Sequence, residues 1–215
     1  MSLQDNIVDY KAGFSQKAPA NVQELMKLAT KNLADSGIVD KAPKVTEKLP
    51  TFSLPNQNGD LVNLSDLLTK GPVVVTFYRG GWCPYCNMEL SAYQEELANI
   101  TAENATLVAI TPELPDSSLS TTEKNALKFE VLTDVNSQYA ASLGIVFSLP
   151  EELRSIYLSF GIEVEKHNGA GQFDLPLAAT FVIAQDGTIA SAFVEADYTA
   201  RKDPTEVVAE LKKLK

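Results

Sequence analysis

Apolar residues along this 215-residue chain gather in short continuous runs, which are separated by longer stretches with helical spacing. The runs at 73–78, 106–110 and 129–132 have the length of buried strands, and a helix-forming stretch follows each of them. Residues 180–194 contain two further runs around a tight turn, which predicts a hairpin. The order of these elements predicts an α/β fold, with a central mixed β-sheet flanked by helices.

Helix-start signals predict where the helices begin. The sequence Ser120-Thr121-Thr122-Glu123 resembles a capping box, and Asp203 precedes Pro204 as a predicted N-cap. A short hairpin followed by a helix capped by Ser65 is expected before the first buried strand. The expected helices are 84–100, one opening at Ser120, 136–143, 150–160 and one from 204 onward.

Residues 1–41 are predicted to form an N-terminal helical extension to a main domain of residues 42–215. The start of its second helix resembles a capping box at Asn21, and Ser36-Gly37 ends that helix. Leu25, Leu28 and neighbouring apolar residues form a stripe that must be buried. That stripe packs either on the main domain or on a second subunit, so a homodimer is one of two alternatives.

Composition restricts the function. Apolar residues make up 45% and charged residues 21%, which is typical of a globular protein with a substantial core. The net charge of −10 disfavours binding to nucleic acid or anionic membranes. The chain shows neither a signal-peptide pattern nor an apolar window long enough to span a membrane. We therefore expect a soluble cytoplasmic protein.

The only two cysteines, Cys83 and Cys86, lie at a predicted junction between a strand and a helix. A helix N-terminus presents free N–H groups and a positive dipole end, which favour a nucleophilic thiolate. Pro84 suits the first helical position. Two thiols at this spacing in a βαβ context indicate a thioredoxin-like redox motif, and the element order fits a thioredoxin fold with a middle insertion.

Other uses of the two cysteines are possible. They could pack as small apolar residues, or bridge two subunits through an iron–sulfur cluster. A structural zinc site needs four ligands, whereas the chain offers two cysteines and one histidine. Thiol redox chemistry is favoured over all three, so we expect no metal and no cofactor.

Residues around the cysteines are candidates for supporting roles. Arg79 is placed to hold either thiolate, with a solvated strand-end arginine as the alternative. Gly81 and the preceding glycine either let a substrate approach closely or form a flexible turn. Trp82 either shields the disulfide or packs in the core. Tyr85 lies between the two cysteines in the motif.

Three polar residues outside the motif are weaker candidates. His167 lies in a predicted loop, where it is either a general acid or simply solvated. Glu113 and Asp134 follow predicted strand ends, where sites of α/β proteins collect. Nothing in the sequence directs these two carboxylates at the thiols.

The string Phe77-Tyr-Arg-Gly-Gly-Trp-Cys-Pro-Tyr-Cys-Asn-Met-Glu-Leu90 resembles the peroxiredoxin-like branch of the alkyl hydroperoxide reductase and thiol-specific antioxidant family. The resemblance covers nearly the whole chain. It implies an antioxidant enzyme that reduces hydroperoxides through a Cys83/Cys86 dithiol-disulfide cycle. It also implies an external reductant of the thioredoxin or glutathione type.

The resemblance includes departures from an ordinary peroxiredoxin, which has Phe-Tyr-Pro, four residues and then Thr-x-x-Cys. Arg79 replaces that proline, Cys83 replaces the threonine, and Cys86 takes the peroxide-attacking position. Ala178 or a near neighbour stands where an arginine is expected.

We nevertheless expect Cys83 to attack first, since the first thiol of such a motif is usually exposed and the second shielded. The reverse order, with Cys86 oxidised first, is the alternative that the family alignment favours. Two other functions remain open. One is the reduction of protein or small-molecule disulfides, and the other is redox sensing without turnover.

Overall fold

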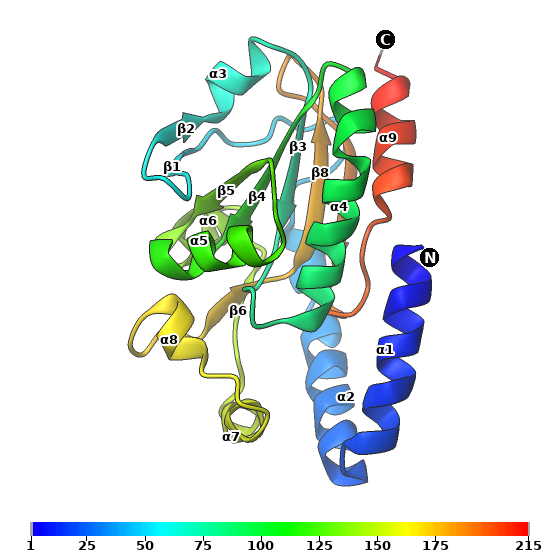
Figure 1. Cartoon of the computed structure of the whole chain (residues 1–215), viewed down its shortest axis with the longest axis vertical. Coiled ribbons are helices and arrows are strands. Elements are labelled where there is room, and N and C mark those ends of the chain that lie inside the picture. The colour runs from blue at the N-terminus through cyan, green and yellow to red at the C-terminus, as the bar shows by residue number, and fades with distance from the viewer. Residues whose placement is uncertain (1, 215) are drawn as a thin grey trace.

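The computed structural model describes residues 2–214 and is built around a five-stranded mixed sheet in the order β5-β4-β3-β8-β9 (Figure 1). The first three of these strands are parallel, while β8 and β9 are antiparallel to their neighbours. The strands are β3 (Val73–Phe77), β4 (Thr106–Thr111), β5 (Glu130–Thr133), β8 (Ala178–Ile183) and β9 (Ile189–Glu195). The sheet confirms the predicted mixed α/β class.

The central strand β3 is fully buried because helices cover both faces of the sheet. Its side chains alternate between two hydrophobic clusters, with Val75 and Phe77 in one and Val74 in the other. This two-sided burial explains why β3 is a continuous apolar run in the sequence. Strand β3 ends at Phe77, and the segment that carries the cysteines follows directly in the chain.

Three helices cover one face of the sheet (Figure 1). They are α1 (Leu3–Lys17), α4 (Pro84–Ala102) and α9 (Pro204–Lys212). Leu3 and Ile7 of α1 are buried with Leu90 and Val207 in the cluster that contains Val74. The N-cap prediction for α9 is confirmed, because the Asp203 carboxylate accepts a hydrogen bond from the Thr205 N–H.

Short elements cover the other face, where Leu64 and Tyr139 are buried in the cluster that contains Val75 and Phe77. These elements are the hairpin β1 (Ser53–Pro55) and β2 (Leu61–Asn63), α3 (Leu64–Leu68), α6 (Gln138–Ser142) and the 3-10 turns η1 (Ile38–Lys41) and η2 (Val135–Ser137). Helix α5 (Pro115–Lys124) connects β4 to β5 and lies beside α4, because the side-chain amide of Asn125, directly after α5, donates to the Asn87 side chain of α4.

The middle insertion forms a small subassembly beside the end of the sheet. Its elements are the paired strands β6 (Val146–Ser148) and β7 (Asp174–Pro176), with α7 (Glu151–Ser159) and α8 (Val164–Asn168) between them. Helix α2 (Ala20–Asp35) lies against α7, and its Leu25 and Met26 contact a cluster that includes Tyr157. No residue of α2 is fully buried. The extension thus packs on its own chain, which does not decide the dimer prediction.

Three predicted helix starts are wrong. Pro19, not Asn21, precedes α2, and no side chain caps that helix. The N-cap of α3 is Asn63 rather than Ser65. Helix α5 begins at Pro115, so the Ser120 sequence lies inside it. Proline sets its own φ near the helical value and restricts its neighbour, and in α2 and α5 this outweighs the capping signals nearby.

Candidate functional site

The two cysteines lie at the N-terminus of α4, where the sequence motif predicts them. Cys83 is the N-cap residue, Pro84 occupies the first turn, and Cys86 follows within that turn. Both thiols are free, and both side chains are 0% exposed. The expectation of an exposed Cys83 is therefore wrong for this structure.

Cys83 is buried because other segments cover the cysteine loop. From α1, the Tyr10 ring packs edge-on against Tyr85, with ring centroids 5.2 Å apart. From α7, Tyr157 packs against Trp82 at 5.8 Å. Burial, and to a smaller extent the negative charge of a Cys83 thiolate, raises the pKa of Tyr10. The Tyr10 hydroxyl of α1 therefore lies close enough to Cys83 for the two groups to interact electrostatically.

Close packing leaves no room for a side chain at Gly80 or Gly81. A Cβ at Gly80, whose φ is +151°, would collide with the Trp82 indole, and one at Gly81 would collide with the Thr121 hydroxyl. The loop is also hydrogen-bonded, since the Cys83 N–H donates to the Gly80 carbonyl at 3.0 Å. The loop is therefore a fixed turn, in which Trp82 packs on the backbone beside Cys83.

Glu113 holds this loop from the end of β4. Its buried carboxylate accepts hydrogen bonds from the Gly81 N–H at 3.0 Å, the Thr121 hydroxyl at 3.2 Å and the Tyr78 hydroxyl at 3.3 Å. The only histidine, His167, contacts the same carboxylate through Nδ1 at 3.2 Å. The sequence assigned Glu113 no link to the thiols, although its place after a strand end was a correct signal. Glu113 thus fixes the backbone of the loop that carries Cys83.

The third polar candidate, Asp134, has a structural role. Its carboxylate accepts hydrogen bonds from the N–H groups of Tyr139 and Ala140 at the start of α6. Asp134 is therefore a helix cap, and among the described residues it forms no hydrogen bond or ion pair with the cysteine loop.

Arg79 connects Cys83 to the surrounding aromatic residues. Its Nη2 donates to the Cys83 Sγ at 3.2 Å and its Nη1 to the Tyr157 hydroxyl at 3.1 Å. The guanidinium also lies over the rings of Trp82 and Tyr198, at 5.1 and 4.4 Å from their centroids. With 4% of its surface exposed, Arg79 is not the solvated strand-end arginine of the alternative interpretation.

A second arginine, Arg201, was missed by the sequence analysis. It lies in the segment between β9 and α9, and its Nη2 donates to the Cys86 Sγ at 3.4 Å. Its Nε lies 3.4 Å from a carboxylate oxygen of Glu89, one turn after Cys86 on α4. Arg201 thus brings an arginine to Cys86 from a segment later than Ala178, where the resemblance implied one. An acidic Glu89 on an otherwise buried helix face was the available signal for a basic partner.

The surroundings of the two thiols separate their pKa values. Burial raises the pKa of both. For Cys83, the hydrogen bond from the Cys86 thiol and the positive charges of Arg79 and Arg201 outweigh burial, so its pKa lies well below the usual value. The pKa of Cys86 lies well above the usual value, because burial is reinforced by its hydrogen bond to Cys83 and by the neighbouring charge. The surroundings therefore favour the thiolate at Cys83 and the thiol at Cys86.

We predict that the Cys83 thiol in the Cys86→Ser protein titrates below the ~8.5 of a free cysteine. The serine hydroxyl still offers a donor, and Arg79 remains in place. Ultraviolet thiolate absorbance followed against pH measures the midpoint. The Cys83→Ser protein is the control, in which Cys86 is expected to titrate higher. A midpoint for Cys83 at or above 8.5 would contradict the prediction.

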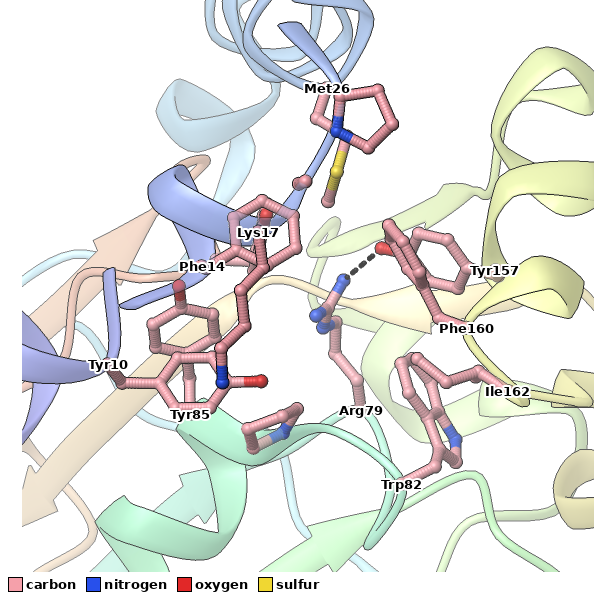
Figure 2. Close-up of a pocket in the computed structure, with 14 residues that line it drawn as sticks. Tyr10, Phe14, Lys17, Met26, Arg79, Trp82, Tyr85, Tyr157, Phe160 and Ile162 are labelled. Atoms are coloured by element: carbon pink, nitrogen blue, oxygen red, sulfur yellow. Dashed lines mark hydrogen bonds between the residues drawn. The ribbon is translucent and has the colours of Figure 1, made fainter. Parts of the chain in front are cut away.

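A cavity of about 480 Å³ lies directly outside the cysteine loop (Figure 2). Arg79 stands in the middle of its lining, with Tyr157 on one side and the rings of Tyr10 and Tyr85 on the other. Neither cysteine lines the cavity. The lining residues are Tyr10, Phe14, Lys17, Ala18, Pro19, Met26, Arg79, Trp82, Pro84, Tyr85, Tyr157, Phe160, Ile162 and Tyr198.

Within residues 2–214, no three His, Cys, Asp or Glu side chains are grouped so that they could hold a metal ion. Over the same residues, no helix combines the length and apolar character needed to cross a membrane.

Comparison with known proteins places the chain among thiol peroxidases. The model of the AhpC/TSA family matches residues 45–192. A putative peroxiredoxin of Mycobacterium tuberculosis is 25% identical over 146 residues, which is 68% of this chain and 82% of that protein. Peroxiredoxin Bcp of Escherichia coli is 28% identical over 102 residues, or 47% of this chain and 65% of that protein.

Solved structures support the fold. The peroxidoxin BcpB of M. tuberculosis superposes with a TM-score of 0.62 at 22% identity, covering 80% of this chain and 98% of that one. The AhpC of Enterococcus faecalis has a TM-score of 0.60 at 20% identity, covering 79% and 90% of the two chains. The thioredoxin-like fold predicted from the motif and element order is confirmed.

Proposed function

The chain belongs to the AhpC/TSA family as a peroxiredoxin-like member of the thioredoxin superfamily, and we propose that it reduces hydroperoxides through the Cys83 and Cys86 dithiol. The Cys83 thiolate attacks the terminal peroxide oxygen, and the O–O bond breaks. The alcohol leaves with the proton that Cys83 released on ionising, and Cys83 becomes a sulfenic acid. The Cys86 thiol then forms the Cys83–Cys86 disulfide, and water leaves.

The contact between the Arg79 guanidinium and the Cys83 Sγ is the observation that carries this proposal. A positive group within hydrogen-bond distance favours the thiolate and stabilises negative charge on the departing oxygen. Cys83 also stands at the N-terminus of α4, where the helix dipole has the same effect. Cys86 has its own arginine, but its raised pKa suits the resolving thiol.

The reductant is the part of the cycle that the chain does not supply. Two thiols of an external dithiol or of glutathione type donate two electrons to the disulfide, and they leave as a disulfide themselves. Access is a constraint, because both sulfurs are buried beneath α1 and α7. The cysteine loop or its cover must therefore shift during reduction.

Reduction of protein or small-molecule disulfides is the second candidate function. It is favoured by the position of both thiols within one helical turn, which is the arrangement of a dithiol reductant. Steady-state rates with hydrogen peroxide, an organic hydroperoxide and a model protein disulfide, all with one reductant, separate the two functions. Turnover of the disulfide alone would replace the peroxidase proposal. Disulfide formation without turnover of any substrate would indicate a redox sensor.

We also propose that the protein works in the cytoplasm, since a reducing compartment keeps two free cysteines reduced. Cell fractionation tests this, and recovery in an oxidising compartment would contradict it.

We expect the protein to form a homodimer through its helical extension. Val8 and Leu28 are 63% and 51% exposed on α1 and α2, so apolar surface remains available for contact. Sedimentation of the full chain over a range of concentrations should give twice the mass of a single chain, and Leu28→Glu should lower that mass. A single-chain mass at every concentration would remove the prediction.

A further inference from the structure

We infer that α1 is a positioning element of the site: it fastens residues 197–201, in the connection between β9 and α9, and so keeps Arg201 on Cys86. Gln4 is the positioning residue, because it contacts the backbone of Arg201 itself. This role rests on the proposed dithiol cycle and adds to it a residue that touches neither sulfur.

The connection between β9 and α9 has little structure of its own. Residues 196–203 belong to neither a helix nor a strand. Their local hydrogen bonds centre on Asp197, whose carboxylate accepts from the N–H and the hydroxyl of Thr199 and whose carbonyl accepts from the Ala200 N–H. A segment without a ladder of backbone hydrogen bonds takes its position from what packs against it.

Helix α1 supplies two contacts that hold this segment. The Gln4 side-chain amide donates to the Arg201 carbonyl at 3.0 Å, and the Lys11 ammonium donates to the Thr199 hydroxyl at 2.9 Å. Helix α1 is itself anchored, because Leu3, which precedes Gln4, is only 4% exposed. Figure 1 shows α1 beside the stretch of chain that enters α9. The position of the segment therefore depends on the extension.

The same segment contacts the arginine partner of each thiol. The Arg201 side chain is 4% exposed and donates to the Cys86 Sγ at 3.4 Å, while its carbonyl accepts from Gln4. One residue thus joins α1 to the sulfur, so a shift of its backbone moves its guanidinium. The Tyr198 ring lies 4.4 Å from the guanidinium of Arg79, which is the partner of the other thiol.

The charge of Arg201 stabilises the reduced form of the pair. Burial raises the pKa of both thiols and is the largest influence on each, whereas Arg201 acts in the opposite direction on both. The Cys83–Cys86 disulfide is neutral, so this stabilisation belongs to the dithiol alone and makes the disulfide easier to reduce. If Arg201 withdraws from Cys86, the equilibrium should therefore shift toward the disulfide.

This support is specific to the chain's own additions. Both α1 and Arg201 lie outside residues 45–192, which match the family. The arginine that the resemblance implied would stand near Ala178, inside the matched region. Support of the thiols by α1 is therefore a feature that the matched region does not contain.

The first test measures the equilibrium between the dithiol and the disulfide in mixtures of reduced and oxidised dithiothreitol. Reduced dithiothreitol passes two electrons to the protein disulfide and becomes a cyclic disulfide, so no peroxide is needed. Gln4→Met keeps the length of the side chain and removes the donor. We expect it to shift the equilibrium constant toward the protein disulfide by about two- to tenfold, the range for one hydrogen bond.

Gln23→Met is the matched control for this equilibrium. The Gln23 amide also belongs to the extension, but it donates to the carbonyls of Ser15 and Ala18 and to no part of residues 197–201. The control should keep the equilibrium constant of the unaltered protein. An unchanged constant in Gln4→Met, or an equal shift in Gln23→Met, would overturn the inference.

The second test asks whether Gln4 acts through Arg201. Arg201→Met alone should shift the equilibrium toward the disulfide by about tenfold or more, because hydrogen bonds to charged groups are the stronger ones. Adding Gln4→Met to Arg201→Met should cause no further shift, since the backbone that Gln4 holds no longer carries the charge. The same shift with and without Arg201 would show that Gln4 acts elsewhere, which contradicts the inference.

Hydrogen exchange tests the fastening directly, and it stands if Arg201→Met folds poorly. The hydrogen-bonded amides of Thr199 and Ala200 should exchange several-fold faster in Gln4→Met and at the original rate in Gln23→Met. Equal exchange in both variants would remove the role of α1.

Failure of this role and failure of the proposed function give different results. A shifted equilibrium in Gln4→Met, with no hydroperoxide reduced by the unaltered protein, would support the role of α1 and overturn the peroxidase proposal. Reduction of hydroperoxides together with an unchanged equilibrium in Gln4→Met would overturn the role of α1 alone.

Discussion

Cys83→Ser is expected to remove essentially all peroxide turnover, whereas Cys86→Ser reacts once with hydroperoxide and then stops. In the first variant the thiol with the lowered pKa is absent, while burial, the largest cause of the raised pKa of Cys86, still disfavours a thiolate at the remaining cysteine. A thiol reacts with peroxide as its thiolate, so the remaining rate should be small. In the second variant Cys83 is oxidised normally, but no other cysteine of the chain is available to resolve it.

Mass mapping of the oxidised residue in each variant measures this. Cys86→Ser should accumulate a sulfenic acid on Cys83, or a mixed disulfide when a small thiol is present. The doubly substituted protein is the control for background oxidation. An adduct on Cys86 in Cys83→Ser, with none on Cys83 in Cys86→Ser, would establish the reverse order that the family alignment favours.

Arg79→Met should slow the reaction of Cys83 with hydroperoxide by about 10²-fold or more at neutral pH. The guanidinium is one of the groups that hold the pKa of Cys83 low, and because it contacts the Cys83 Sγ we expect it also to stabilise charge on the departing oxygen. Loss of one preorganised donor of this kind typically costs about 10²- to 10³-fold in rate. Methionine keeps much of the apolar volume among the aromatic rings.

The pH dependence separates the two contributions of Arg79. When the pKa of Cys83 rises, the thiolate is lost over the interval between the old and the new value, so the rate of Arg79→Met should climb as the pH is raised through the new pKa. The defect that remains at high pH measures transition-state stabilisation alone. Stopped-flow oxidation followed from pH 6 to 10 provides the profile.

Arg154 supplies the matched control. Its guanidinium also stacks on an aromatic ring, that of Phe173, and its Nε donates to the Leu149 carbonyl. Arg154→Met therefore removes a stacked arginine whose hydrogen bond and ring contact involve neither cysteine, and the oxidation rate should stay unchanged. If Arg79→Met also reacted at the rate of the unaltered protein, Arg79 would have no part in activating Cys83.

Local patterns in the sequence were enough to predict most of the framework. The buried run that became β3, the proline that opens α4 and the Asp203 cap of α9 each depend on residues close together in the chain. The position of Cys83 and Cys86 at a helix start is local in the same sense. The strands β6 and β7 escaped prediction, since three residues are too few for hydrophobic periodicity to show; the equally short β1 and β2 were predicted from the turn between them.

The surroundings of the thiols were decided by tertiary structure. Arg201 reaches Cys86 across 115 positions of the chain, and Glu113 holds Gly81 across 32. The cover that Tyr10 and Tyr157 place over the loop comes from the N-terminal extension and from the middle insertion. Residue type and spacing predict that a dithiol lies at a helix start, because helix and strand propensity act between neighbours. Burial, charge and the shape of a cavity depend on which distant segments pack together, and that determined how deeply Cys83 lies and which groups face it.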